Sequence, residues 1–229
     1  MDWRRECLAV IPCYNEGRAV AAVVKSVKRH LNTVLVVDDA SIDATAQQAK
    51  IAGALVVSHP NRSGKGAALQ TGWGWARENG FRWAITLDGD GQHAAEDIPV
   101  FLACAEREHA DLVVGNRMDN PREMPWLRRV VNRWMSRKLS QAAGQRLADT
   151  QCGFRLMNLA CWPQRSLQAG HYEIESEMLL AFAAAGLCIR FVPIQVIYRD
   201  ERSKISPALD TLRWFRWYRR TRQARSRAE

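Results

Sequence analysis

Two aspartates near the middle of the chain are the residues whose type and spacing point most directly to chemistry. Asp88 and Asp90 flank Gly89, directly after the apolar run 84–87, and Gln92 follows two residues later. Carboxylate and amide oxygens at this spacing can share Mg²⁺ or Mn²⁺, which keeps further positions for water and substrate phosphates. The same letters can also form an ordinary Asp-Gly turn. The surroundings of the pattern must therefore decide between a metal site and a turn.

Similar polar groups follow the other apolar runs of the first half of the chain. The segments concerned are 12–16, 38–39, 61–66 and 115–117. Each stands after a short run of Val, Ile or Leu, which is typical of a strand buried on both faces. Ligands bind at the carboxyl ends of the strands in such sheets. We therefore expect these segments to converge on one site with Asp88 and its neighbours.

The elements that must position these segments alternate between strand and helix patterns. The expected strands are 7–11, 34–37, 55–57, 84–87 and 112–114, and the expected helices are 17–31, 43–52, 64–79 and 96–108. Pro12 is expected to end the first strand, and Asp43 to cap the second helix. The alternation predicts an α/β fold in which a mostly parallel, Rossmann-like sheet carries helices on both faces.

After residue 116 the regular alternation ends. Helices are expected over 126–142, 173–185 and 206–222, with a strand at 189–192. The chain shows neither an internal repeat nor a flexible linker. We therefore expect a single domain over residues 1–205, followed by a basic aromatic helix and tail over residues 206–229.

The positive charge of the chain is concentrated in two segments. The formal net charge is +9, yet residues 122–138 carry +5 and residues 202–229 carry +7, so the remainder is slightly negative. In the last helix Trp214, Phe215, Trp217 and Tyr218 alternate with arginines, a composition suited to a membrane interface. The alternative is a helix whose aromatic side chains pack inward while its arginines face solvent.

Several features predict the compartment. The longest apolar runs are shorter than the roughly 18 to 20 residues that cross a bilayer, and residues 1–6 lack the apolar region of a secretion signal. The six cysteines form no C-x-x-C pair, so we interpret them as buried thiols in a reducing compartment. These features predict a cytoplasmic protein that associates peripherally with the inner face of the cytoplasmic membrane.

Seven stretches in a fixed order resemble one known family. They are Ile11–Glu16, Val36–Asp43, Asn61–Ala68, Leu87–His93, Gly115–Arg117, Asp149–Arg155 and Arg202–Lys204. The sequence resembles the family 2 glycosyltransferases of the GT-A fold, and most of all the branch that contains dolichol-phosphate mannose synthase and bacterial polyprenyl-phosphate glycosyltransferases. The resemblance covers residues 8–205. Three small departures, Cys13, Ala40 and Cys152, remove no charged role but leave the donor sugar open.

The resemblance implies roles for individual residues. Those implied to bind the nucleotide sugar are Pro12, Tyr14, Glu16, Val37, Asp39, Asp88, Gly89 and Lys204. Asp88, Asp90 and Gln92 would hold Mg²⁺ or Mn²⁺. Arg117, Arg202 and Lys204 resemble the family's phosphate-binding positions, and the catalytic residues implied are Asp90, Arg117 and Arg202.

The expected reaction is an inverting transfer of a sugar from a GDP-mannose-type or UDP-glucose-type donor to a polyprenyl phosphate. A lipid phosphate is already an anion, so this acceptor needs no general base. A hydroxyl acceptor on a glycolipid or polysaccharide would need one, and Glu173, Glu175 and Glu177 are then the candidates. Two further alternatives are a nucleic-acid-binding protein, suggested by the basic charge, and a non-catalytic membrane-surface protein. A nucleic-acid partner is not expected, because it leaves the paired aspartates unexplained. The oligomeric state stays open.

Overall fold

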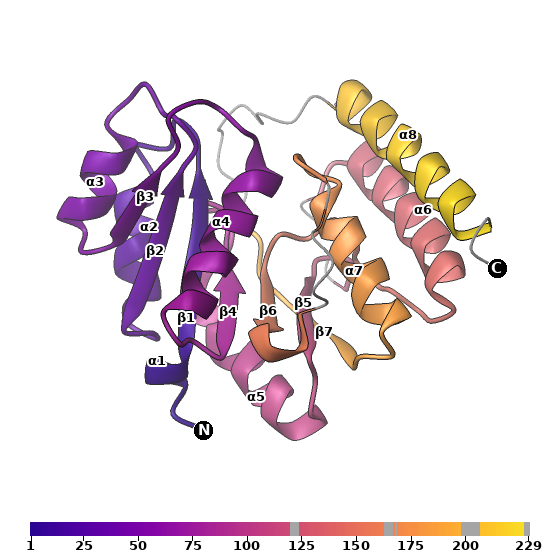
Figure 1. The fold of residues 1–229 in the computed structure, drawn as a ribbon, viewed down its shortest axis with the longest axis horizontal. Helices are drawn as coiled ribbons and strands as arrows, with labels where there is room; N and C mark the ends of the chain where they lie inside the picture. Colours follow the sequence, from indigo (N-terminus) through magenta and orange to yellow (C-terminus); the bar gives the residue numbers. More distant parts are fainter. Residues whose placement is uncertain (120–123, 163–166, 168, 198–206, 227–229) are drawn as a thin grey trace.

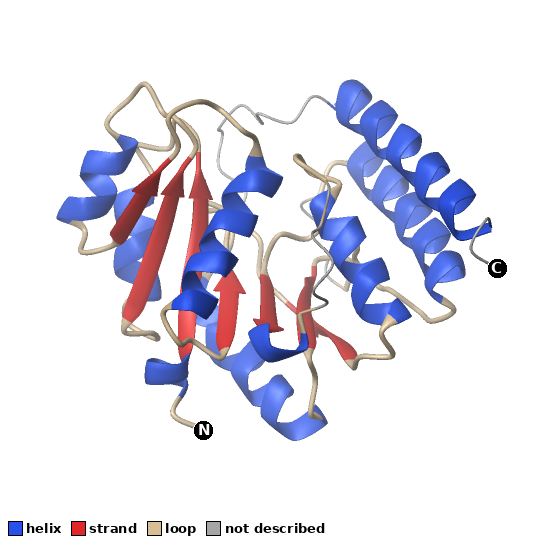
Figure 2. Cartoon of the chain, in the orientation of Figure 1, coloured by secondary structure: helices blue, strands red, loops and turns tan. Residues whose placement is uncertain are grey.

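The computed structural model describes residues 1–119, 124–162, 167, 169–197 and 207–226. Within these residues a seven-stranded sheet runs through the molecule, in the order β3-β2-β1-β4-β6-β5-β7 (Figures 1 and 2). The strands are β1 (Cys7–Cys13), β2 (Thr33–Asp38), β3 (Leu55–Ser58), β4 (Trp83–Thr86), β5 (Leu112–Asn116), β6 (Arg155–Asn158) and β7 (Ile189–Pro193). The expected α/β fold with a mostly parallel sheet is confirmed.

The first strand is longer than the sequence predicts. We expected Pro12 to end it, but β1 continues through Pro12 to Cys13. Its pairing with β4 stops at Val10, whereas its pairing with β2 continues to Cys13. From Val10 onward β1 therefore has a partner on one side, and a proline is tolerated at such a position because a strand edge does not need every N–H group.

Strand β6 was not expected from the sequence, and it is the one antiparallel strand of the sheet described here. It pairs with β4 on one side and β5 on the other. Its amino end consequently lies at the edge of the sheet where the parallel strands have their carboxyl ends. The residues that precede β6 are thus brought to the expected site, although they do not follow any strand.

Helices cover both faces of the sheet. They are α1 (Trp3–Glu6), α2 (Val20–Val27), α3 (Thr45–Ile51), α4 (Lys65–Glu78), α5 (Ile98–Glu108), α6 (Trp126–Ala143), α7 (Ile174–Ala184) and α8 (Pro207–Ser226), with 3₁₀ turns at Ala95–Asp97 and Leu159–Cys161. Helices α4 and α7 lie in front of the sheet in Figure 2, and α2 lies behind it. The N-cap residue of α3 is Ala44 and not Asp43 as expected. Asp43 precedes it and accepts a hydrogen bond from the Thr45 N–H in the first turn.

Helix α8 packs along α6, far from α3 (Figure 1). The rings of Trp214 and Tyr218 stack with their centroids 5.1 Å apart, and both side chains are buried in the hydrophobic core. The Tyr218 hydroxyl donates a hydrogen bond to the Lys138 carbonyl. Arg213 and Arg216 are exposed. Two of the aromatic residues expected at a membrane interface therefore face the protein instead. The expected boundary at residue 205 lies outside the described residues.

Candidate active site

The carboxyl ends of β1, β2 and β4 place polar side chains at one edge of the sheet. The loop after β1 is held to the loop after β2 by three hydrogen bonds across the two segments. The Asn15 N–H donates to Ser41 Oγ, the Ile42 N–H to Asn15 Oδ1, and the Glu16 N–H to Thr45 Oγ1. Tertiary contacts thus fix the backbone of the segment that carries Tyr14 and Glu16.

Two of the residues expected to bind the nucleotide are buried within strands, whereas Tyr14 is half-buried. Pro12 and Val37 are buried within β1 and β2. A Cβ on Gly72 of α4 would stand 3.3 Å from a methyl carbon of Val37, so this side chain packs into the core under α4. Tyr14 is half-buried, and the guanidinium carbon of Arg62 stands 4.0 Å from its ring centroid. A flat ring with an arginine above it can accommodate a nucleobase.

Asp39 is tied to the loop that leads into α4. Its Oδ1 accepts hydrogen bonds from the Ser63 N–H and the His59 ring, and its Oδ2 accepts one from the Gly64 N–H. Burial raises the pKa of Asp39, but these hydrogen bonds outweigh it and the net pKa is lowered. Asp39 therefore braces the 59–64 loop and retains little acceptor capacity for a nucleotide.

Asp88 belongs to a buried ion-pair cluster. Lys65 Nζ stands 2.6 Å from Asp88 Oδ1 and 2.8 Å from Glu175 Oε1. Burial opposes the charge on Asp88, yet Lys65 and the neighbouring His93 lower its pKa to about 2. Burial in turn lowers the pKa of His93 to about 4, so this imidazole is neutral at pH 7.

Asp90 is in the opposite electrostatic situation. Its Oδ1 accepts a hydrogen bond from the Gln92 N–H at 3.0 Å. Burial and the negative charges of Asp88 and Glu16 raise its pKa to about 6. A carboxylate in such surroundings is stabilised by an added cation.

The fit of a divalent cation to this edge follows from these charges. Within the described ranges no three His, Cys, Asp or Glu side chains converge closely enough to form a metal cage. Mg²⁺, however, is usually held by one or two carboxylates together with substrate phosphates and water. The unneutralised charge of Asp90, with the Gln92 amide beside it in sequence, meets that requirement. Asp88 is less available, because Lys65 already engages one of its oxygens.

Two glycines leave room around the aspartates. A Cβ on Gly89 would stand 2.5 Å from Cys13 Sγ, and a Cβ on Gly153 would stand 2.9 Å from Asp88 Oδ2 and 3.0 Å from Lys65 Nζ. At Gly89 and Gly153 an added Cβ would therefore force a neighbouring side chain to shift. Gly153 lies just before β6, which shows how the antiparallel strand contributes to the site.

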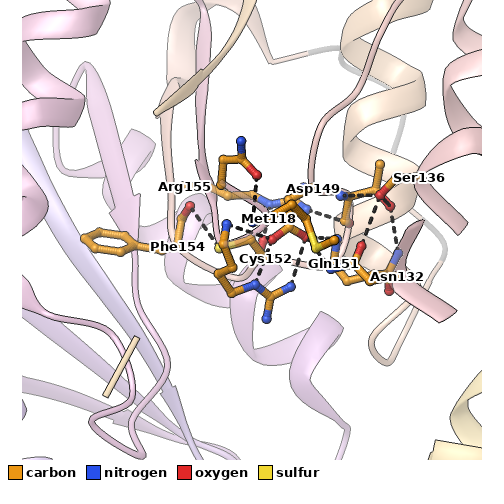
Figure 3. Close-up of polar contacts among 11 residues, drawn as sticks. Met118, Asn132, Ser136, Asp149, Gln151, Cys152, Phe154 and Arg155 are labelled. Atoms are coloured by element: carbon orange, nitrogen blue, oxygen red, sulfur yellow. Dashed lines mark hydrogen bonds and ion pairs between the residues drawn. The ribbon is translucent and has the colours of Figure 1, made fainter. Parts of the chain in front are cut away.

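Arg117, at the end of β5, is anchored by Asp149. Arg117 Nε stands 2.8 Å and Nη2 3.0 Å from the two carboxylate oxygens of Asp149. Asp149 is fully buried, and it also accepts hydrogen bonds from Asn132 of α6 and the Gln151 N–H (Figure 3). Burial raises the pKa of Asp149, but Arg117 outweighs it and the net pKa is lowered. The charge of Arg117 also lowers the pKa of Asp88. Arg117 follows β5 and Asp88 follows β4, so both residues lie at the same edge of the sheet.

Beneath this network, Arg155 joins the segment before β6 to α7. This fully buried side chain donates hydrogen bonds to the carbonyls of Thr150, Cys152 and Glu175. A buried guanidinium has five donors to satisfy, and these carbonyls take up several of them. Arg155 thus fixes Gly153 and Glu175 on either side of Asp88. Arg202 and Lys204, both expected to bind phosphate, lie outside the described residues.

The three candidate glutamates have different positions. Glu175 is buried and pairs with Lys65. Glu177 accepts a hydrogen bond from the Ala169 N–H, and Glu173 is the residue before the first turn of α7. Sequence reasoning gave no role to Lys65, although it lies in the quoted stretch Asn61–Ala68. A lysine between two glycines at the start of a helix was the available signal.

The comparison with known families now decides the class of the protein. The family described as glycosyl transferase family 2 matches residues 8–160, about two thirds of the chain and most of the site residues above. The chain belongs to glycosyl transferase family 2. It is therefore a glycosyltransferase.

Two curated relatives of this glycosyltransferase act on lipid phosphates, as their names state. It is 31% identical over 214 residues to the UDP-N-acetylglucosamine–dolichyl-phosphate N-acetylglucosaminyltransferase of Methanococcus voltae, covering 83% of this chain and 85% of the relative. It is 29% identical over 212 residues to the undecaprenyl-phosphate mannosyltransferase of Micrococcus luteus, covering 84% of each chain.

A solved structure confirms the expected GT-A fold. Glucosyl-3-phosphoglycerate synthase from Mycobacterium tuberculosis, solved with Mn²⁺, UDP-glucose and phosphoglyceric acid, superposes with a TM-score of 0.72 at 21% identity. The match covers 92% of this glycosyltransferase and 77% of the synthase. At this identity the likeness concerns the fold.

Proposed function

We propose that this glycosyltransferase moves a sugar from a nucleotide-sugar donor, of the GDP-mannose or UDP-glucose type, to a polyprenyl phosphate such as dolichyl or undecaprenyl phosphate. The observation that carries the proposal is the position of Arg117. Arg117 directly follows β5 and Asp88 follows β4, and these two strands flank β6 and end at the same edge of the sheet. A cation suited to an acceptor phosphate is therefore at the same edge as the carboxylates proposed to lie at the donor diphosphate. Relatives at 29–31% identity with named lipid-phosphate acceptors support the same acceptor class.

On the donor side, Tyr14 and Glu16 are proposed to face the nucleoside. Asp90 and Gln92 are the proposed holders of Mg²⁺ or Mn²⁺, with Asp88 beside them. When bound, such a cation supplies charge neutralisation for the departing nucleoside diphosphate. Gly89 is proposed to offer its backbone to the diphosphate, and a Cβ at this position would stand 2.5 Å from Cys13 Sγ.

The acceptor is activated by its own charge. An oxygen of the lipid phosphate attacks the anomeric carbon from the face opposite the leaving group. The new C–O bond forms as the bond to the nucleoside diphosphate breaks, and the bonding electron pair leaves with the diphosphate, so the anomeric configuration inverts. Arg117, oriented by Asp149, reduces the repulsion between the two phosphate-bearing substrates. Arg202 and Lys204 are proposed to assist.

We propose that the enzyme meets its lipid acceptor through one end of the molecule, at the inner face of the cytoplasmic membrane. Among the described helices none is long and apolar enough to span a bilayer. Helix α6, however, exposes the large apolar side chains of Trp126, Leu127, Val130 and Trp134, and exposed arginines stand on α6 and α8. Apolar side chains surrounded by arginines suit an anionic lipid surface. We call these four apolar residues the α6 apolar face.

Release of nucleoside diphosphate from a panel of GDP- and UDP-sugars tests the proposal. Each donor is assayed with and without polyprenyl phosphate, and with Mn²⁺ or excess EDTA. Release that requires both the lipid phosphate and the cation is expected, with Asp90→Asn as the inactive control. Release that requires a saccharide hydroxyl and is indifferent to lipid phosphate would contradict the proposed acceptor.

A further inference from the structure

Lys65 is a cation placed inside the carboxylate cluster by three separate parts of the fold. It is the first residue of α4, whereas Asp88 follows β4 and Glu175 lies in the first turn of α7. Its ammonium is within 2.8 Å of an oxygen of each carboxylate. Its side chain is 16% exposed, that of Asp88 is 30% exposed and that of Glu175 is 6% exposed, so the pair with Glu175 is shielded from solvent and the pair with Asp88 is partly shielded.

The surroundings hold the ammonium in place. Gly153 leaves only enough space for the pair, since a Cβ there would stand 3.0 Å from Lys65 Nζ. The Glu175 side chain is 6% exposed. If Lys65 moved away, Glu175 would be a buried carboxylate without its cation, which is strongly unfavourable. Lys65 is therefore a resident charge of the site.

The ion pairs are not needed to dock the loop before α4 onto the segment before α7. The Gly66 N–H already donates a hydrogen bond to the Gly170 carbonyl. Moreover, a Cβ on Gly66 would stand 2.3 Å from the Ala169 carbonyl oxygen, so the two backbones are in direct contact. The lysine thus has an effect on the site beyond joining these segments.

That effect is on the charge available to a divalent cation. Without Lys65, the negative charges of Asp88 and Glu175 would lose the ammonium that they share, and the charge of Asp88 would add to that of Asp90 nearby. Less compensated carboxylates attract Mn²⁺ or Mg²⁺ more strongly. With Lys65 in place, one oxygen of Asp88 is engaged and one charge of the cluster is cancelled.

We propose that Lys65 makes entry of the divalent cation depend on the donor. Lys65 is a positioning residue that acts through Asp88. It keeps the nucleotide-free site too weakly charged to hold the cation tightly, and the donor diphosphate then supplies the missing anionic ligands. Cation and donor consequently bind together. The inference rests on the proposed function, because that function brings the cation to Asp90.

Mn²⁺ binding to the full chain tests this inference without any turnover. Loss of the signal of free aqueous Mn²⁺ in electron paramagnetic resonance gives the affinity, with and without UDP or GDP. The wild type is expected to bind Mn²⁺ weakly alone and much more tightly with nucleotide. Lys65→Met should bind nucleotide-free Mn²⁺ at least about tenfold more tightly than the wild type, because the cluster loses its cation. Lys65→Arg, the matched control, should stay close to the wild type.

Two results would overturn the inference: Lys65→Met matching the wild type without nucleotide, or Lys65→Arg changing the affinity as much as Lys65→Met. If Lys65→Met does not fold, Glu175→Gln decides. It leaves Lys65 paired with Asp88 and removes one negative charge, so nucleotide-free Mn²⁺ should bind no more tightly than in the wild type. Tighter binding would contradict the inference. Turnover that is insensitive to EDTA would instead remove the cation from the proposed function.

Discussion

Asp88 and Asp90 are two residues apart, yet their carboxyl groups differ by about four pKa units. Lys65 and His93 lower the pKa of Asp88 to about 2 against the effect of burial. Asp90 lacks such a partner among the described residues and has its pKa raised to about 6 by burial, Asp88 and Glu16. The motif therefore contains one neutralised carboxylate and one that favours an incoming cation. Individual side chains outside the motif create this difference.

The close approach of Gly153 to Asp88 predicts the effect of adding one methyl group at position 153. Gly153→Ala places a Cβ 2.9 Å from Asp88 Oδ2, so the carboxylate must shift. A displaced catalytic group costs rate, and we expect kcat/KM for the nucleotide sugar to fall by about tenfold or more. Steady-state kinetics with the donor found in the panel measures it.

The matched control is Gly74→Ala, at a position in α4 where an added Cβ meets nothing within 4 Å. It should leave kcat/KM unchanged and raise the free energy of unfolding by about 0.5 to 1 kcal/mol, because alanine is the better helix former. Wild-type kcat/KM in Gly153→Ala would show that Asp88 tolerates the shift and would contradict the prediction.

The pair of Arg117 and Asp149 gives a prediction for how the stability of the protein depends on pH. The folded-state pKa of Asp149 is lowered, so its contribution to stability is complete above its unfolded pKa of about 3.9 and is lost as the pH falls further. Asp149→Asn should lower the free energy of unfolding by about 3 kcal/mol at pH 7, since it leaves Arg117 without its carboxylate.

Urea unfolding followed by circular dichroism at several pH values measures this difference. The free energy of unfolding should differ between the wild type and Asp149→Asn by a constant amount from pH 7 to pH 5. Below about pH 4 this difference should become smaller. Asn132→Asp is unsuitable as a control because it adds a charge beside Asp149. Ser140→Ala, on the same face of α6, should give a difference that is independent of pH. If the difference in the free energy of unfolding between the wild type and Asp149→Asn begins to narrow between pH 5 and pH 7, the lowered pKa of Asp149 would be contradicted.

At the scale of the elements, the site depends on side chains that three helices contribute. Helix α4 supplies Lys65, α7 supplies Glu175, and α6 supplies Asn132 for Asp149. Helix α7 is in turn joined to α8, because Trp214 Nε1 donates a hydrogen bond to Ser176 Oγ at 2.9 Å. Helix α8 therefore supports the site through α7, one residue beyond Glu175.

This connection predicts the effect of removing the Trp214 ring. Trp214→Ala loses a buried aromatic side chain and the hydrogen bond to Ser176, and comparable truncations cost about 3 to 5 kcal/mol. Because α8 is the last described element of the chain, we expect it to detach from α6 while the sheet stays folded. Limited trypsin digestion should then cleave at the arginines of α8 at least tenfold faster.

The matched control is Phe215→Ala, one residue along the same helix. Phe215 is 40% exposed, so its truncation should leave the rate of digestion within about twofold of the wild type, because exposed apolar residues contribute little to stability. Equal digestion rates for Trp214→Ala and the wild type would show that Trp214 does not hold α8.

At the scale of the whole molecule, exposed apolar side chains occur at two separate ends. The α6 apolar face lies beside α8, whereas Ile42 and Ile51 are exposed at and near α3 on the other side of the sheet (Figure 1). The basic segments of the chain accompany the first group. The proposed orientation therefore directs α6 and α8 towards the lipid and α3 away from it.

Vesicle flotation tests this orientation. The double substitution Trp126→Ser and Val130→Ser should reduce the fraction that floats with vesicles containing anionic lipid by at least about fivefold, since both apolar insertion and surface charge contribute to binding. Raising the salt concentration should weaken binding of the wild type as well.

The matched control is Ile42→Ser with Ile51→Ser, which removes two exposed apolar side chains at the other end. This variant should float like the wild type. A wild type that stays entirely in the soluble fraction, or a control that loses binding as strongly as the α6 variant, would contradict the proposed membrane contact.

The sequence determined the architecture of the first half because local patterns carry that information. Apolar runs predicted β1 to β5 within one or two residues at most boundaries, and the aspartates after β4 indicated the site edge. The motif order also indicated the family. Strand β6 was missed, because Arg155–Asn158 is four residues long with a buried arginine at its start, which resembles no strand pattern. The sequence also left open whether the aromatic side chains of α8 pack inward, since composition does not tell which way each ring points; Trp214 and Tyr218 are buried.

The tertiary structure alone decided how the candidate residues divide their tasks. Asp39 appeared suited to the nucleotide, but the 59–64 loop folds back and uses its oxygens. Glu175 and Lys65 are separated by more than a hundred residues, and they meet because α4 and α7 both begin at this edge of the sheet. Spacing along a chain can specify which groups follow a strand. The electrostatic environment of a carboxyl group is set by charges that arrive from elsewhere in the sequence, and only the folded chain brings them together.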